Sequence, residues 1–251
     1  MAKFFVSPET IVGKCIRLTG DDASHISRVL RMKVGEEIIV CDSQGTDYRT
    51  IISAISDHDV EVDILDSYLS ENEPALEITL FQGLPKGDKM ELIIQKCVEL
   101  GVSRIVPMAT EFAVAKISDS KSEIKKLTRW NKVSEEAAKQ SGRGRLPNVT
   151  IMMSIAEAIE LSRGMDMAFV PYEKSSEIDA KGLSQLLKRD GQKPSKIGFF
   201  IGPEGGFSKK EIAQFIENSI TPVSLGKRIL RTETAGMAVL ALLMYEFGYM
   251  D

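Results

Sequence analysis

Apolar and polar residues alternate in short runs over the first seventy residues of the chain. The runs are bounded by glycine and aspartate turns, and they cover residues 3–6, 14–18, 37–41, 48–55 and 60–65. Alternation with a period of two between such turns predicts half-buried strands, and a series of them indicates a small antiparallel β-barrel. Residues 21–31 interrupt this pattern, and we expect one helix there.

The periodicity changes after residues 70–74, SENEP, whose composition is that of a loop. The expected strands beyond this point are 76–82, 104–109, 149–152, 167–171, 197–201 and 221–225, and the expected helices are 89–100, 120–141, 180–188 and 234–247. Two further helices begin at the capping boxes Ser154 to Glu157 and Ser208 to Glu211. This alternation predicts an α/β fold with a mostly parallel sheet and helices on both faces. We therefore expect two domains, 1–70 and 74–251.

The charge of the chain gives no overall sign of nucleic-acid binding. The net charge is -4, with 43% hydrophobic and 27% charged residues, as in an ordinary soluble protein. A basic surface must therefore be local, and residues 116–145 supply one, with nine lysines and arginines against four acidic residues. The segment is either a polyanion-binding surface or a solvated helix face.

Cysteine and histidine spacing predicts no metal site. Cys15, Cys41 and Cys97 lie far apart in apolar surroundings, without a CxxC pair or a zinc-like spacing to histidine, so we expect reduced core thiols. The start MAKFFVSPET has no long apolar segment, which favours a cytoplasmic location without a signal peptide. The apolar residues 235–247 are too few to span a bilayer, and we expect a buried helix there.

Two glycine-rich turns carry the strongest functional signal. Residues 196–207, KIGFFIGPEGGF, and 223–235, VSLGKRILRTETA, each end an apolar strand in such a turn, which then leads into a helix. In a parallel sheet both turns lie at one edge, where backbone amides line a shared pocket. Neither a P-loop nor a GxGxxG fingerprint is present. The alternative is a pair of tight connections without a ligand.

Charged residues in the second turn lie close to a very apolar helix, so they need partners. Glu233 and Thr234 fit the first helical turn, where their side chains can satisfy free amides. Arg231 projects from the turn itself and is the stronger candidate for a site.

The two turns resemble the paired C-terminal motifs of the SPOUT methyltransferases, and more closely those of the RsmE type. Further motifs that resemble this family are HISRVLRMKVG at 25–35, LPKGDKM at 84–90, QKCVELGV at 95–102 and EEAAKQSGR at 135–143. The resemblance covers most of the chain. It implies an N-terminal PUA-like barrel for RNA, a C-terminal domain tied in a trefoil knot, a homodimer, and methylation of uracil N3 in 16S ribosomal RNA of the small subunit.

The resemblance also implies which residues hold S-adenosylmethionine and RNA. The cofactor residues are Pro171, Tyr172, Glu173, Ile201, Gly202, Pro203, Gly205, Gly206, Leu225, Gly226, Ile229, Leu230, Thr234 and Ala235. The RNA residues are His25, Arg28, Arg31, Lys86, Lys89, Gln140 and Arg143. His25 and Arg28 share a helix face at three-residue spacing, which suits phosphate contact or a plain solvated surface.

The chain departs from the family at residues 110–116, TEFAVAK, where Phe112 and Ala113 replace arginine and serine. Phe112 either stacks on an unpaired base or belongs to the core, and we expect the core. Lys3 likewise replaces a common arginine. The departures affect the expected RNA contacts more than the expected reaction.

Methyl transfer to N3 of uracil requires an unpaired base and loss of the imide proton. Negative charge then develops on the ring oxygens, and Arg231 is the candidate cation that stabilises it. Glu233 orients Arg231, accepts the proton, or only caps the helix. Two alternatives remain, namely a ribosome-assembly protein that has lost catalysis and a methyltransferase acting on another RNA.

Overall fold

The computed structural model describes residues 1–113, 120–173, 180–188 and 193–250. Lys116 and Asp119 of the expected basic segment lie outside the described residues. The chain forms two compact units, Met1–Glu73 with Ala138–Leu146, and Pro74–Ala137 with Pro147–Asp251. A single cut, such as the expected division into 1–70 and 74–251, does not separate these units, because Ala138–Leu146 belongs with the N-terminal one.

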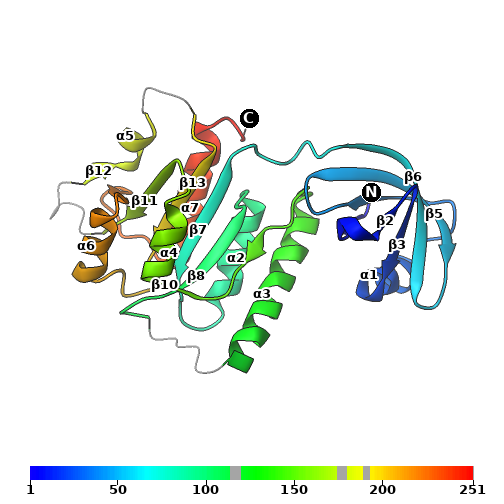
Figure 1. Ribbon diagram of the computed structural model, residues 1–251, viewed down its shortest axis with the longest axis horizontal. Helices are drawn as coiled ribbons and strands as arrows, with labels where there is room; N and C mark the ends of the chain where they lie inside the picture. The colour runs from blue at the N-terminus through cyan, green and yellow to red at the C-terminus, as the bar shows by residue number, and fades with distance from the viewer. Residues whose placement is uncertain (114–119, 174–179, 189–192, 251) are drawn as a thin grey trace. The chain divides into compact units, whose positions relative to one another are not determined.

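The N-terminal unit is a curled sheet of six strands (Figure 1). The strands are β1 (Lys3–Phe5), β2 (Ile11–Val12), β3 (Cys15–Thr19), β4 (Glu37–Cys41), β5 (Thr46–Ile55) and β6 (Asp59–Leu69), in the order β1-β4-β5-β6-β3-β2. All pairs are antiparallel except β1 with β4. Alternate residues of these strands, among them Ile16, Ile38 and Val62, point into one apolar core, which is why the period of two predicted them.

The single α-helix expected over 21–31 is observed as a short α-helix followed by a π-helical turn. A short turn, η1 (Pro8–Thr10), precedes it, α1 spans Gly20–Ser24, and the chain then continues as a π-helical turn, η2 (His25–Val29). The amide of Leu30 accordingly donates to the carbonyl of His25 over 2.9 Å. The wider π turn rotates each following residue, so His25 and Arg28 do not share an α-helical face as the spacing predicted.

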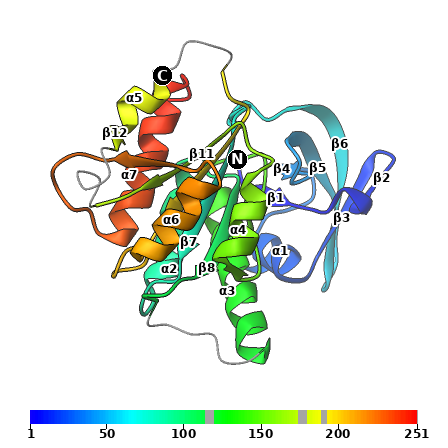
Figure 2. The ribbon, with the colours of Figure 1, turned by 60° about the vertical axis from the view of Figure 1, so that its left-hand side comes forward.

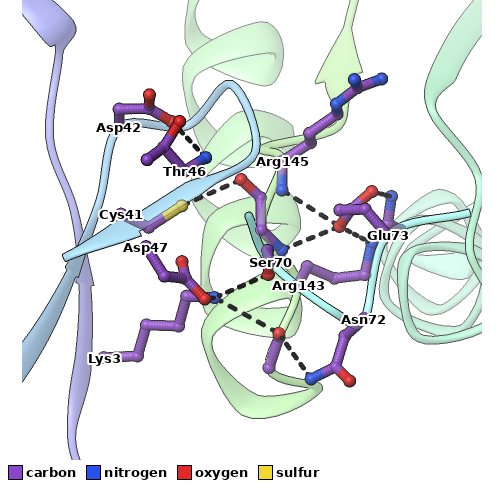
Figure 3. Close-up of polar contacts among 12 residues, drawn as sticks. Lys3, Cys41, Asp42, Thr46, Asp47, Ser70, Asn72, Glu73, Arg143 and Arg145 are labelled. Atoms are coloured by element: carbon purple, nitrogen blue, oxygen red, sulfur yellow. Dashed lines mark hydrogen bonds and ion pairs between the residues drawn. The ribbon is translucent and has the colours of Figure 1, made fainter. Parts of the chain in front are cut away.

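A carboxylate anchors Ala138–Leu146 within the N-terminal unit (Figure 3). Oε1 of Glu73 accepts hydrogen bonds from Nε of Arg143 at 2.7 Å and from the amides of Gly144 at 2.8 Å and Arg145 at 3.0 Å. Lys3 pairs with Asp47 at 2.8 Å in the same cluster. Charges this far from water are stable only when paired, and these pairs fix where the segment lies.

The C-terminal unit contains a parallel sheet, as predicted, and the sheet has eight strands where six were expected (Figures 1 and 2). Its strands are β7 (Glu77–Gly83), β8 (Arg104–Ala109), β9 (Asn148–Val149), β10 (Met153–Ser154), β11 (Met167–Pro171), β12 (Lys181–Gly182), β13 (Lys196–Ile201) and β14 (Thr221–Ser224). The order is β10-β8-β7-β13-β11-β14-β12, and β9 pairs with β8 off this path. The single strand expected over 149–152 is replaced by the two short strands β9 and β10.

Helices cover both faces of this sheet, as the alternation predicted (Figure 2). They are α2 (Lys89–Glu99), α3 (Ser120–Gln140), α4 (Ile155–Ser162), α5 (Leu183–Leu187), α6 (Lys209–Glu217) and α7 (Thr232–Glu246). Phe81 faces the core shared with α4 and α6, where it stacks on Phe200 at a centroid distance of 4.3 Å. The adjacent Leu80 faces α2 and α7 instead, because successive strand residues point to opposite faces.

The local helix signals in the sequence agree with the structure. Both capping boxes form, with the amide of Ser154 donating to Glu157 and the amide of Ser208 donating to Glu211, each over 2.8 Å. The helix expected over 180–188 is only the five-residue α5, preceded by β12.

Within the described residues, no helix combines the length and the apolar character that crossing a bilayer requires.

Two expectations about burial were wrong in part. Cys41 and Cys97 are buried free thiols, but Cys15 is only half-buried at the end of the sheet near β2. The apolar helix α7 buries Val239 and Leu243, whereas Leu242 is 49% exposed and Tyr245 is 68% exposed. A uniformly apolar sequence predicts burial of the whole helix, but the sheet covers only one of its faces.

Candidate active site

A pocket of about 350 Å³ lies at the carboxyl ends of the neighbouring strands β11, β13 and β14. This is the edge at which parallel α/β sheets bind ligands. Both glycine turns line it, as expected from their positions after β13 and β14. The lining residues are Lys89, Pro171, Tyr172, Glu173, Ile201, Gly202, Pro203, Glu204, Gly206, Phe207, Leu225, Gly226, Lys227, Arg228, Ile229, Leu230, Arg231, Thr232, Glu233 and Ala235.

The first loop, Gly202–Gly206, is held by backbone packing that only glycine permits. A Cβ on Gly83 at the end of β7 would lie 2.6 Å from Cδ of Pro203. A Cβ on Gly202 would lie 2.9 Å from the carbonyl carbon of Gly206, because the two ends of the loop meet. The amide of Gly206 closes the loop by donating to the carbonyl of Pro203 over 2.9 Å. These contacts leave little freedom in the loop before any ligand binds.

The outer side of the same loop faces Phe112. A Cβ on Gly205 would lie 2.8 Å from Cβ of Phe112, so Gly205 does not line the pocket. The amide of Glu111 donates to the buried carboxylate of Glu211 over 2.8 Å, which fixes this turn. The expectation that Phe112 is a core residue was wrong, because its side chain is 46% exposed. The sequence could not show this, since the loop that Phe112 contacts is more than ninety residues away in the chain.

A buried chain of hydrogen bonds joins three segments beneath the pocket. Nε2 of Gln82 donates to Oγ1 of Thr232 over 2.9 Å, and Thr232 donates to the carbonyl of Gly202 over 2.6 Å. Gln82 is the second-last residue of β7, Gly202 begins the first loop, and Thr232 begins α7. The bonds therefore fix both pocket loops to the sheet. Neither Gln82 nor Thr232 was singled out from the sequence.

The second loop reaches α7 through Arg231, which is the N-cap residue of that helix. Gly226 adopts a φ of 105°, and its amide donates to the hydroxyl of Ser224 over 3.1 Å. Within the part of the chain that the structure describes, Arg231 makes no side-chain capping bond, and its side chain is exposed at the rim of the pocket. Thr234 is exposed on α7 and does not line the pocket. Glu233 lies in the first turn of α7, where a carboxylate is favoured by the helix dipole.

Lys89 lies in the pocket wall between two carboxylates. Its Nζ donates to Glu204 over 2.8 Å and lies 3.7 Å from Oε2 of Glu233. The hydrogen bond from Lys89 to Glu204 raises the pKa of the lysine. Burial opposes ionisation of Glu204, but the donors Lys89 and the Lys86 amide outweigh burial and lower the pKa of that carboxyl. Among the described residues, Glu233 is thus paired with Lys89 and not with Arg231.

The residues expected to contact RNA fall into different environments. His25, Arg28, Arg31, Lys86 and Gln140 are exposed. Arg28 also lines a shallow hollow in the N-terminal unit with Ser27, Ile55, Ser56 and Asp57.

Arg143 and Lys3 do not offer their charges to solvent. The side chain of Arg143 is 4% exposed and paired with Glu73, and that of Lys3 is 10% exposed and paired with Asp47. The EEAAKQSGR motif thus contributes a structural arginine, and the expected RNA contact by Arg143 is not available in this structure.

Within the described part of the chain, no three or more His, Cys, Asp or Glu side chains gather as a metal site would require.

Comparison with known proteins places these features in one family. A family described as an RNA methyltransferase domain matches residues 71–244, and one described as an RNA methyltransferase PUA domain matches residues 18–65. Ribosomal RNA small subunit methyltransferase E of Bacillus subtilis is 33% identical over 229 residues, which cover 91% of this chain and 89% of that protein. The protein of the same name from Synechocystis is 33% identical over 240 residues, which cover 95% of this chain and 76% of that protein.

Solved structures agree with the sequence comparison. Ribosomal RNA small subunit methyltransferase E from Neisseria gonorrhoeae, bound to S-adenosyl methionine, has 32% sequence identity and a TM-score of 0.84. The match covers 98% of this chain and 97% of that chain. The parallel α/β sheet and the curled N-terminal sheet are thus shared with this relative over nearly the whole length. The chain belongs to the ribosomal RNA small subunit methyltransferase E family of RNA methyltransferases.

Proposed function

We propose that this protein transfers a methyl group from S-adenosylmethionine to N3 of a uracil in 16S ribosomal RNA of the small subunit, in the cytoplasm. The observation that carries the proposal is the pocket formed by two glycine loops at the carboxyl ends of β11, β13 and β14, in a chain of this family. The PUA family match over residues 18–65 supports RNA as the substrate.

The residues present suit S-adenosylmethionine. Ile201, Leu225 and Leu230 give the pocket an apolar wall for an adenine ring, and the glycines allow the backbone to approach it. Glu173, Glu204 and Glu233 line the same space, and carboxylates favour the positive charge of a sulfonium. We assign the cofactor contacts to Pro171, Tyr172 and Glu173 and to those residues of both loops that line the pocket. Gly205 and Thr234 act from outside the pocket, by packing the loop and by continuing α7.

Bound S-adenosylmethionine supplies an electrophilic methyl group. The contribution of the chain is to orient the acceptor base and to manage its charge and proton. Arg231 has an exposed guanidinium at the pocket rim, where it can approach a ring oxygen of uracil as negative charge develops. Glu233 lines the same pocket, and its carboxylate is suited to accept the imide proton.

Exposed residues of both units support RNA binding. We propose that His25, Arg28 and Arg31 contact phosphates from the N-terminal unit, together with Gln140, and that Lys86 does so from the C-terminal unit. Phosphate contacts release counterions, so binding weakens with salt.

We also propose that the protein is a homodimer. The exposed side of α7 presents Leu242 and Tyr245, and Tyr249 and Met250, which follow the helix, are also exposed, so four large apolar side chains near the end of the chain are accessible to a partner. Such a face suits a second copy in a two-fold arrangement. Light scattering should give twice the mass of the chain, and Leu242→Glu should give the single mass.

Two measurements test the function. Isothermal calorimetry on the pure protein should detect S-adenosylmethionine binding, and its absence would exclude the enzyme in favour of an assembly protein. Mass spectrometry of 16S ribosomal RNA from a deletion strain should show loss of one N3-methyluridine, restored by the gene. Unchanged uridine methylation in that strain would overturn the substrate assignment and favour another RNA.

A further inference from the structure

Three segments of the C-terminal unit meet at the ammonium group of Lys89. Lys89 begins α2, Glu204 lies in the middle of the first pocket loop, and Glu233 lies in the first turn of α7. The carboxylate of Glu204 also accepts from the amide of Lys86 over 3.1 Å. Glu204 therefore holds the ammonium group of Lys89 by a hydrogen bond, and the same ammonium group lies within ion-pair distance of Glu233.

Glu233 is placed unusually for a carboxylate in a helix. Its Oε2 atom is buried and has no hydrogen-bond partner among the residues that the structure describes, although it belongs to a residue that lines the pocket. The 3.7 Å distance to Lys89 gives charge attraction without a hydrogen bond. A buried acceptor without a donor is costly, and it persists where a ligand supplies the donor.

We propose that Lys89 is a positioning residue that keeps Glu233 ionised and fixed, so that Oε2 of Glu233 accepts the imide proton of the target uracil. The inference rests on the proposed function. Glu204 serves the same purpose indirectly, because it holds the Lys89 ammonium in place. This differs from an RNA contact, which the sequence suggested for Lys89.

The proton and electrons balance in this scheme. The N3–H bond breaks as the proton passes to Oε2 of Glu233, and the pair left on N3 forms the new bond to the methyl carbon. The pair of the broken carbon–sulfur bond stays on sulfur, which becomes a neutral thioether. Glu233 then releases its proton to solvent through the open mouth of the pocket.

The charge state of Glu233 depends on all groups that share the pocket. The cations are Lys89 from α2, Arg231 from the start of α7, and Lys227 and Arg228 from the loop after β14, while Glu173 and Glu204 are the other carboxylates. Lys89 is the cation paired with Glu233 in the described part of the chain. Removing its charge leaves Glu233 close to Glu204 without the intervening ammonium, which favours the protonated carboxyl.

The first test needs neither RNA nor cofactor. Carbon NMR of the glutamate carboxyl groups, with Glu233 assigned through Glu233→Gln, follows the titration of Glu233 in the wild-type protein, Lys89→Met and Lys89→Arg. We expect the midpoint to be higher in Lys89→Met than in the wild-type protein and to return toward the wild-type value in Lys89→Arg. An unchanged midpoint in Lys89→Met would overturn the role of Lys89. Because this arm uses the free protein, it does not depend on which RNA is methylated.

The second test measures single-turnover methylation of small-subunit RNA against pH. We expect the acidic limb of the profile to move upward in Lys89→Met, with cofactor affinity within a few fold of wild type. Glu233→Gln should lose about a hundredfold or more in kcat with a small change in KM. Full activity of Glu233→Gln would overturn the assignment of the acceptor. If the wild-type protein methylates no uracil N3, the proposed function fails, and the NMR result still decides whether Lys89 controls Glu233.

Lys96→Met is the matched control. Lys96 lies on the same helix and pairs with one carboxylate, Glu99, on the exposed surface. We expect Lys96→Met to leave both the titration and the pH profile unchanged. Thermal melting confirms that each variant is folded. If Lys89→Met is not folded, Lys89→Gln provides the second test, since it removes the charge but keeps a polar side chain that can bond to Glu204. We expect Lys89→Gln to move the acidic limb upward as well, and an unchanged profile there would count against the proposal.

Discussion

The hydroxyl of Thr232 donates a hydrogen bond of 2.6 Å to the carbonyl of Gly202, although thirty residues separate them in the chain. The same oxygen accepts from Gln82 over 2.9 Å. One side chain therefore joins the start of α7 to the first pocket loop and to the end of β7. The shape of the pocket depends on this contact.

Thr232→Val should destabilise the protein and weaken cofactor binding. Valine has nearly the same shape but leaves the Gly202 carbonyl and the Gln82 amide without this partner, at a cost of about 1–3 kcal/mol in the free energy of unfolding. Urea denaturation measures this cost, and calorimetry measures the affinity for S-adenosylmethionine. Thr232→Ser keeps the hydroxyl and is the control. Equal stability of the valine and serine variants would show that the hydrogen bonds contribute little.

Gly83→Ala should disturb the first loop directly. The added Cβ would lie 2.6 Å from Cδ and 2.7 Å from the backbone nitrogen of Pro203, so β7 and the loop must separate. We expect a loss of about 1–3 kcal/mol in stability, together with weaker cofactor binding. Gly164→Ala is the control, because the atom nearest to its Cβ is 3.9 Å away. Wild-type cofactor affinity in Gly83→Ala would mean that the loop is not fixed by this contact.

Arg231→Ala should lower kcat by about a hundredfold and change the affinity for S-adenosylmethionine by only a few fold. The reason is that Arg231 is proposed to stabilise charge that arises only during methyl transfer. Single-turnover kinetics and calorimetry separate the two effects. A large loss of cofactor affinity with normal turnover at saturation would place Arg231 on the cofactor instead.

Arg143→Met should affect folding, whereas Arg28→Ala should affect RNA binding. Breaking the buried pair of Arg143 with Glu73 leaves the carboxylate with its two backbone amide donors but without a counter-charge, and it costs about 3–5 kcal/mol. Arg28 is exposed, and its removal should leave the urea midpoint unchanged while the slope of log affinity against log salt falls by about one. If Arg143→Met keeps the stability of the wild-type protein but binds RNA more weakly, this result would support the RNA contact that the sequence suggested for Arg143.

Thiol reactivity should distinguish Cys15 from the other two cysteines. Burial raises the pKa of the Cys41 and Cys97 thiols to about 12. A raised pKa means that the thiol stays protonated, so at pH 8 only about one part in ten thousand is the reactive thiolate. Burial and then Glu61 and Asp63 also raise the pKa of Cys15, but this side chain is accessible. An aromatic disulfide reagent should label one thiol in the folded protein and all three in denaturant. Cys15→Ser is the control, and it should lose the labelling that the folded wild-type protein shows. Rapid labelling of two or more thiols in the folded protein would contradict the burial of Cys41 and Cys97.

Much of the fold followed from local patterns. Period-two alternation predicted the N-terminal strands, and the alternation of strands with helices predicted the parallel sheet. The two capping boxes were readable because a serine and a glutamate three residues apart satisfy each other without distant help. The predictions of short helices and strands were less accurate, because β9, β10 and α5 are too short for a hydrophobic period to define them.

The sequence by itself determined that two glycine turns follow apolar strands of a parallel sheet, and therefore that a pocket lies at one sheet edge. Only the tertiary structure decided the partners of the charged residues. It pairs Lys89 with Glu204 and Glu233, buries Arg143 against Glu73, and leaves Phe112 exposed. The physical reason is that the energy of a charge depends on burial and on its nearest opposite charge, and both are set by segments about seventy or more residues away. Backbone preferences act within a few residues, so they specify the turns but not what the turns contact.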